Sequence, residues 1–166
     1  MIAPLAKDGT PYPTPNTREA GARPMIQRLR QIAGFVAGLF LGGVANMLLL
    51  GAIGAIVPAP EGVDPNDLES IRANIGSYAP VHFVAPFVAH AGGALAGALL
   101  ATLIGGYRRM YAGLAIGAFF LLGGIAMVAM IPETPIWFAA LDLLGAYLPM
   151  GWLGWRIASV MRGRPA

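Results

Sequence analysis

Cysteine is absent from the 166 residues, and charged side chains are few. The absence of cysteine excludes disulfides, thiol redox relays, cysteine-ligated zinc and iron–sulfur clusters. Only 11% of the residues are charged, against about a quarter in soluble domains, whereas 57% are hydrophobic. These few polar side chains cannot cover the surface of a water-soluble domain. We therefore expect part of the solvent of this protein to be lipid.

Sequence motifs for catalysis and nucleic-acid binding are also lacking. The chain contains no GxSxG or HExxH motif and few serines, which argues against serine and zinc hydrolases. No basic stretch is interleaved with aromatic residues in the way that nucleic-acid-binding proteins require. We predict no catalytic residue, no metal site, no cofactor and no nucleic-acid partner, so the chain is not expected to be an enzyme.

Four apolar segments occupy most of the chain, at residues 32–57, 81–104, 110–131 and 136–157. A helix of about 20 residues crosses the ~30 Å hydrocarbon core of a bilayer, so each segment is long enough to span it. The segments are too long for barrel strands and lack alternating polarity. The sequence predicts an all-α, polytopic membrane protein, with four transmembrane helices in an antiparallel bundle over residues 31–158.

The segments outside the spans carry most of the charge. Residues 1–30 are rich in proline and predict a flexible tail, and residues 159–166 form a short basic tail. Apart from Arg72, the arginines precede the first span, separate the second from the third or lie near the end of the chain: Arg18, Arg23, Arg28, Arg30, Arg108, Arg109, Arg156, Arg162 and Arg164. By the positive-inside rule, this distribution predicts that both termini lie in the cytoplasm.

The loop at residues 58–80 is the one sizeable connection on the opposite, acidic side. Asp64 has the properties of a helix N-cap. Leu68, Ile71 and Ile75 follow at a spacing that places them on one helical face. The loop therefore predicts a short amphipathic helix that covers the end of the bundle or lies on the membrane surface.

Glycines recur every four residues in the first two spans. They include Gly34, Gly38 and Gly42 in the first span, and Gly93 and Gly97 in the second. Because lipid gives helices no hydrophobic drive to associate, such small residues favour close backbone approach. We interpret them as helix-packing positions in a glycine zipper inside the bundle, with contact across a homo-oligomer as the alternative. The expected partners are the lipid bilayer and other membrane subunits, including further copies of the chain.

Three polar side chains lie deep in three different spans. Counted from the outer end of each span at 1.5 Å per residue, Asn46 lies roughly 16 Å deep, His90 roughly 14 Å and Asp142 roughly 9 Å. Burying any of them without a partner costs several kcal/mol, so we expect them to form one cluster inside the bundle. His90 and Asp142 would then be either a proton-accepting pair or a hydrogen-bonded support for the helices.

Two prolines and a second histidine complete the candidate features. Pro86 and Pro149 interrupt their spans and predict kinks, which serve either as hinges or to curve a helix around its neighbours. His82 lies at the outer boundary, where we expect a structural role. Because only His90 is deep, a haem bound by two histidines would need a second copy of the chain.

The second, third and fourth spans also resemble known sequences. Five motifs carry the likeness: His82-Phe83, Pro86-Phe87, Ala89-His90-Ala91-Gly92, Gly123-Gly124-Ile125-Ala126-Met127 and Leu141-Asp142-Leu143. With these motifs, residues 30–158 resemble a family of small, uncharacterised bacterial four-helix inner-membrane proteins. The resemblance implies a location in the bacterial cytoplasmic membrane and no particular activity.

These observations leave three functional hypotheses. The first is a structural or accessory subunit that packs with other membrane components. The second is a small proton-linked transporter or carrier that uses His90 and Asp142, and the third is a lipid- or quinone-binding module. A transporter needs a hydrated route to His90, whereas a structural subunit needs only a dry, glycine-packed interior.

Overall fold

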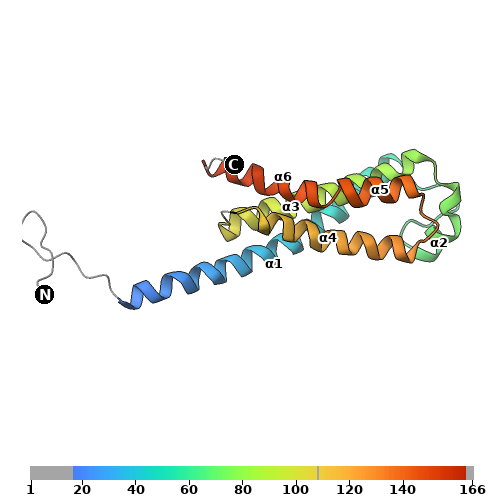
Figure 1. Cartoon of the computed structure of the whole chain (residues 1–166). Coiled ribbons are helices and arrows are strands. Elements are labelled where there is room, and N and C mark those ends of the chain that lie inside the picture. Colours follow the sequence, from blue (N-terminus) through green and yellow to red (C-terminus); the bar gives the residue numbers. More distant parts are fainter. Residues whose placement is uncertain (1–16, 108, 164–166) are drawn as a thin grey trace, which may run out of the picture.

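The computed structural model describes residues 17–107 and 109–163, with side chains from Pro24 onward, and every element in these ranges is helical (Figure 1). Four helical segments are long and apolar enough to cross a membrane: Pro24–Ile56, Pro80–Gly105, Tyr111–Met130 and Ile136–Met161. The predictions of a helical fold, for the described residues, and of four helices long and apolar enough to cross a membrane are confirmed. The chain is therefore a multi-pass membrane protein.

The first helix, α1, runs from Thr17 to Ile56 and has 40 residues. At 1.5 Å per residue it is about 60 Å long, and its N-terminal part extends well beyond the other helices (Figure 1). Residues 17–30 were predicted to belong to a flexible tail, but they are helical despite Pro24 inside the helix. The reason is that good helix formers follow Pro24, and extending a helix is easier than nucleating one. Residues 1–16 lie outside the described residues.

The acidic loop folds into α2 (Leu68–Asn74) and two 3₁₀ turns, η1 (Ile75–Ser77) and η2 (Pro80–Phe83). The N-cap of α2 is Asp67, whose carboxylate accepts a hydrogen bond from the backbone N–H of Glu69. Asp64, the predicted N-cap, instead accepts from the N–H of Asn66 in the preceding turn. The helix thus begins later than predicted, because Asp64 is used to close a turn.

The short helix α2 lies over one end of the bundle (Figure 1). A small buried cluster lies under it, formed by Ile75, Phe83, Ile131 and Phe138. Leu68, Ile71 and Tyr78 pack against this cluster from the loop. Burial raises the pKa of Tyr78, so its phenol stays neutral at physiological pH.

The remaining spans are α3 (Val84–Gly105), α4 (Tyr111–Met130) and a pair of shorter helices, α5 (Ile136–Gly145) and α6 (Leu148–Met161). Pro86 does not kink the interior of a helix as predicted, because α3 begins only at Val84 and Pro86 lies in its first turn. Backbone N–H groups in the first turn of a helix have no partner within the helix, so a proline there costs no hydrogen bond.

The fourth span is broken rather than kinked. Between α5 and α6, Ala146 and Tyr147 leave the regular helix, and Pro149 is the second residue of α6. A proline disfavours helical conformation in the residue before it and cannot donate to the carbonyl four residues earlier, here Gly145. Pro149 therefore marks the start of a new helix, and the interruption lies two to three residues before it.

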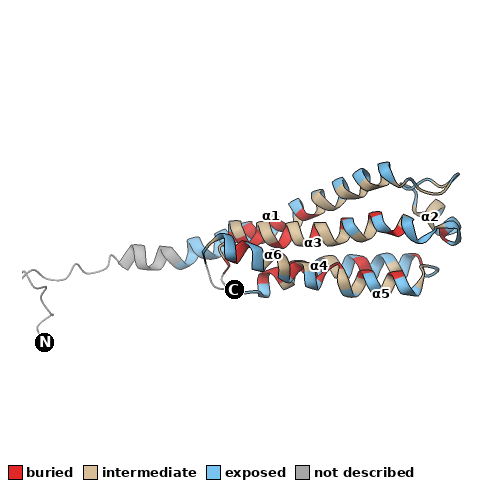
Figure 2. Ribbon diagram, turned by 90° about the horizontal axis from the view of Figure 1, so that it is seen from above, coloured by how far each residue is buried: buried red, intermediate tan, exposed pale blue. Residues whose placement is uncertain are grey.

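Glycines mediate the contact between α1 and α3. A Cβ added to Gly38 would lie 2.6 Å from the Gly97 oxygen, and one added to Gly42 would lie 2.7 Å from the Gly93 oxygen. Gly34 faces Gly105 in the same way, so the two helices run in opposite directions. α3 also packs against α4 and α6, whereas the far end of α1 diverges from the bundle (Figure 2).

A candidate intramembrane polar site

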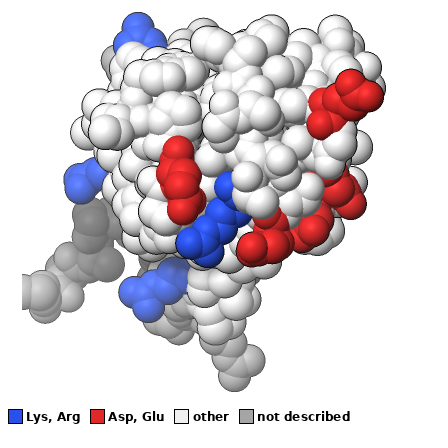
Figure 3. All heavy atoms as spheres, turned by 90° about the vertical axis from the view of Figure 1, so that its right-hand side faces the viewer, with Lys and Arg blue, Asp and Glu red and all other residues white. Residues whose placement is uncertain are grey.

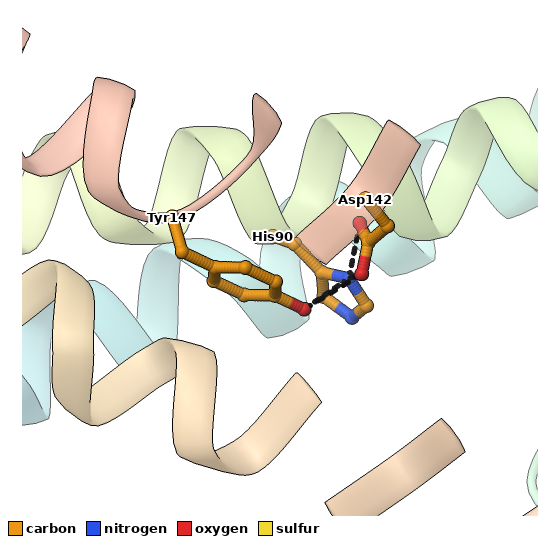
Figure 4. Close-up of polar contacts among 3 residues, drawn as sticks. All are labelled: His90, Asp142 and Tyr147. Atoms are coloured by element: carbon orange, nitrogen blue, oxygen red, sulfur yellow. Dashed lines mark hydrogen bonds and ion pairs between the residues drawn. The ribbon is translucent and has the colours of Figure 1, made fainter. Parts of the chain in front are cut away.

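His90, Asp142 and Tyr147 form a hydrogen-bonded network inside the bundle (Figure 4). The His90 Nδ1 atom lies 2.9 Å from Asp142 Oδ1 and 3.0 Å from Oδ2. The Tyr147 hydroxyl donates to Asp142 Oδ2 at 2.8 Å, and its oxygen lies 2.9 Å from His90 Nδ1. One carboxylate thus contacts both of its polar neighbours.

The donors and acceptors of the network fit one arrangement of protons. With a proton on Nδ1, the histidine ring and the Tyr147 hydroxyl both donate to the Asp142 carboxylate. A carboxylate that holds Nδ1–H fixes the tautomer and leaves the lone pair on Nε2. Among the described residues, Nε2 of His90 has no hydrogen-bond partner. It is the one atom of the ring that is available to a further proton or ligand.

Burial differs sharply within the network. The side chain of Asp142 is 4% exposed and Tyr147 is 1% exposed, whereas the His90 side chain is 25% exposed. The carboxylate is therefore shielded by the protein, and the histidine faces outward from the network. This is the geometry of a buried orienting group behind a more accessible imidazole.

The break between α5 and α6 brings Tyr147 to the other two residues. Residues five apart on a continuous helix point about 140° away from each other. Because the chain leaves the helix at Ala146 and Tyr147, the phenol turns back onto Asp142. Its ring stacks on the His90 ring with centroids 5.5 Å apart.

Two glycines of α4 make room for Tyr147. A Cβ on Gly124 would overlap the Tyr147 hydroxyl, and one on Gly117 would lie 2.7 Å from the Tyr147 carbonyl oxygen. The network thus takes His90 from α3, Asp142 from α5 and Tyr147 from the α5–α6 break, and α4 packs against Tyr147. Any larger residue at Gly124 would displace the phenol from the carboxylate.

Asn46, the third residue of the predicted cluster, is not part of the network. Its Cα and Cβ pack against Gly93 on α3, and no described residue bonds its buried Oδ1 atom. Asn46 lies level with Gly93, about one helical turn from His90 on α3, but the depth estimate carries no information about which face of α1 Asn46 occupies. The stripe that contains Gly38 and Gly42 continues to Asn46, and this stripe faces α3.

Tyr147 is the member of the site that sequence reasoning missed. The sequence signal for Tyr147 was the pair Gly145 and Pro149, because a glycine and a proline four residues apart favour an interruption of the helix between them. Tyr147 lies in this interval, five residues after Asp142. Within the described part of the chain, no three His, Asp or Glu side chains gather as ligands of a metal ion. The site offers one imidazole, one carboxylate and one phenol.

None of the family models, curated proteins or solved structures with which the chain was compared matches it. The likeness to small bacterial inner-membrane proteins therefore stays a prediction from the sequence.

Proposed function

We propose that the chain is a small proton-linked carrier of the bacterial cytoplasmic membrane, in which the His90–Asp142–Tyr147 network accepts and releases a proton. One observation carries the proposal: the Asp142 carboxylate contacts both neighbours and leaves His90 Nε2 without a partner among the described residues. An imidazole can bind and release a proton at a ring nitrogen whose lone pair is free. Ionisable groups inside a membrane are costly and mark functional sites by default.

The broken fourth span supports the same proposal. Transporters bind substrates and protons near interrupted helices, where non-helical backbone is tolerated because it lies inside the protein. Here the interruption at Ala146 and Tyr147 is buried and adjoins the network. A purely structural polar contact does not need an interrupted helix beside it.

The charge distribution supports an antiparallel bundle with both termini in the cytoplasm. The acidic end carries Glu61, Asp64, Asp67, Glu69 and Glu133. Figure 3 looks onto this end, where acidic side chains gather around a basic one. In this part of the molecule, Arg72 Nε lies 3.7 Å from Glu133 Oε2. Arg30 and Arg162 lie at the opposite end, where each donates to a carbonyl near the end of α3, and arginines remain on the cytoplasmic side of bacterial membranes.

Proton flux into liposomes tests this proposal. The purified chain is reconstituted with a pH-sensitive dye inside the vesicles, and an acid jump is applied outside. We expect the wild-type chain to acidify the interior faster than empty vesicles, and His90→Gln to remove most of that difference. His82→Gln, a change to the other histidine, serves as the matched control. Equal rates for wild type, His90→Gln and empty vesicles would contradict the proposal that protons move through the site.

A second candidate function, an accessory subunit, is favoured by the diverging end of α1. Gly51 and Gly54 have no atom within 4 Å of an added Cβ, and neighbouring apolar side chains such as Met47 and Leu48 are exposed. Small residues on a lipid-facing helix allow another helix to approach closely. Cross-linking from a cysteine at position 51 in the membrane tests it, because a subunit gives defined adducts and a solitary carrier gives none.

A further inference from the structure

One face of α1 is apolar along the helix and points away from the other helices. Its four large side chains are 59% to 69% exposed. Gly38, which packs against α3, lies on the opposite side of the helix. We call this face the α1 stripe and define it by six residues at spacings of three, four or seven: Leu29, Val36, Phe40, Gly43, Met47 and Gly51.

The α1 stripe continues beyond the end of the bundle. Arg30 donates to the Ile104 carbonyl oxygen near the end of α3, so the residues before Arg30 extend past α3 (Figure 1). Met25 and Leu29 lie in this extension and are 60% and 59% exposed. Arg28 lies at the same level, and arginines at the end of a span belong to the headgroup region. The hydrocarbon of the bilayer therefore does not cover this part of the stripe, and exposed apolar patches outside lipid mark contacts between proteins.

Large and empty positions alternate along the stripe within the membrane. An added Cβ on Gly43 or Gly51 meets nothing within 4 Å. Phe40 and Met47, three and four residues before these glycines, are 69% and 65% exposed. Because glycine lets another helix approach closely, the large side chains of one such stripe fit over the glycines of a second. A two-fold pair needs this property, since each surface has to complement itself.

Charge and area are compatible with a pair of identical stripes. Copies of the chain with one topology place their stripes at the same depth. Residues 28 and 30 each point about 100° away from Leu29, so the arginines of both copies stay outside the contact. Extended to Met25 and Gly54 on the same face, the stripe is about 45 Å long and about one helix diameter wide. Two copies then bury roughly 1,000 Å² in total, which is about the minimum for a specific interface.

We propose that the α1 stripe is the contact between two parallel copies of the chain in the membrane. The second copy covers the apolar side chains that extend past the bundle and fills the space over the glycines. The pair is independent of proton movement at His90, because the stripe lies on the side of α1 that faces away from α3.

Disulfide cross-linking of the full chain in bacterial membranes tests the pair, because the sequence has no cysteine of its own. Met47→Cys lies on the stripe. Leu48→Cys is the matched control, since the two side chains are 65% and 68% exposed but point about 100° apart. After oxidation, we expect a product of twice the mass of the chain to form at least fivefold faster from Met47→Cys. Leu29→Cys and its control Gln27→Cys repeat the comparison in the extension, in case Met47→Cys fails to fold.

Each outcome bears on the proposal. Faster dimer formation from the stripe cysteines supports it if the rate persists after tenfold dilution of the chain with lipid. Equal rates from stripe and control cysteines, or rates that fall in proportion to dilution, overturn it, because random collisions then explain the product. An adduct of another mass in place of the dimer also overturns it, because the stripe then binds a different protein.

Discussion

Asp142 is the residue on which the polar network depends, because it is the one member that contacts both others through its carboxylate oxygens. Its side chain is almost fully buried, so neither oxygen has water to replace a lost partner. Removing the carboxylate leaves two polar groups in an apolar interior, and such orphaned groups cost about 1–3 kcal/mol each.

A stability cycle at this residue measures the coupling. We expect Asp142→Leu to lower the free energy of unfolding in mild detergent by about 1–3 kcal/mol. His90→Leu alone is also destabilising, but the double variant is no worse than Asp142→Leu, because the two groups share one interaction. Asn46→Leu is the control and leaves stability unchanged or raises it, since the buried Oδ1 atom has no partner. Additive losses in the double variant would contradict a direct interaction.

The sequence predicts two members of this site and misplaces a third. Counting residues along each span places His90 and Asp142 at similar depths. Because an unpaired ionisable side chain inside a membrane costs free energy, the sequence predicts that the two side chains meet. The same count includes Asn46, whose side of α1 it does not specify. Tyr147 escapes such counting because its contact with Asp142 depends on where the fourth span breaks.

The contact between α1 and α3 is the element-scale feature that fixes the bundle. The four-residue spacing of small residues could be predicted from the sequence. The pairing of the helices could not, because many pairs of helices satisfy the same periodicity. The structure pairs Gly38 with Gly97 and Gly42 with Gly93. α1 and α3 therefore have no space for a side chain between them at these positions.

Substitution of a single glycine tests this contact. Gly38→Ala places a methyl group 2.6 Å from the Gly97 oxygen, so we expect a loss of about 1–3 kcal/mol from overpacking. Gly43→Ala is the matched control on the same helix, where an added Cβ meets nothing within 4 Å. It should be neutral or stabilising by up to about 1 kcal/mol, because alanine favours helix. Thermal unfolding of both variants checks this, and a Gly38→Ala variant as stable as Gly43→Ala would contradict the close contact.

The cap of α2 gives a second element-scale prediction. Asp67→Ala removes the side-chain acceptor for the Glu69 N–H, which costs a helix about 0.5–2 kcal/mol. We expect faster amide hydrogen exchange across residues 69–74. Asp64→Ala, the matched control, removes a turn contact and should leave exchange in α2 nearly unchanged. The opposite order of the two variants would place the N-cap at Asp64, as the sequence alone predicts.

At the scale of single elements, prediction from the sequence is limited because two residues of the same type can compete for one local role. An N-cap residue and a turn residue carry the same side chain, so Asp64 and Asp67 are hard to distinguish before the chain is folded. Pro86 and Pro149 both interrupt spans in the sequence. Only the structure tells that the first lies in a first turn and the second follows a break.

At the scale of the whole molecule, charge separates the two ends. The loop end is acidic and the opposite end is held together by arginines, among them Arg30 and Arg162. Composition and span lengths predict this multi-pass architecture well, because lipid admits few alternatives. The divergence of α1 from the bundle carries no comparable sequence signal.

Cysteine labelling tests the orientation directly, because the chain has no cysteine of its own. We expect Ser77→Cys, in the acidic loop, to react with a membrane-impermeant maleimide in intact bacterial spheroplasts. Met110→Cys, between the second and third spans, should react only after the membrane is permeabilised. The reverse pattern would contradict cytoplasmic termini.

The proposed function requires that His90 exchanges a proton at Nε2 while Asp142 holds Nδ1. Nitrogen-15 NMR of histidine-labelled protein in lipid, recorded as a function of pH, tests it most directly, with His82→Gln assigning the signals. We expect a protonated Nδ1 throughout and an Nε2 signal that changes reversibly with pH, and we expect Asp142→Asn to abolish this pattern. A His90 ring whose two nitrogens do not respond to pH would contradict it and leave the network a structural contact.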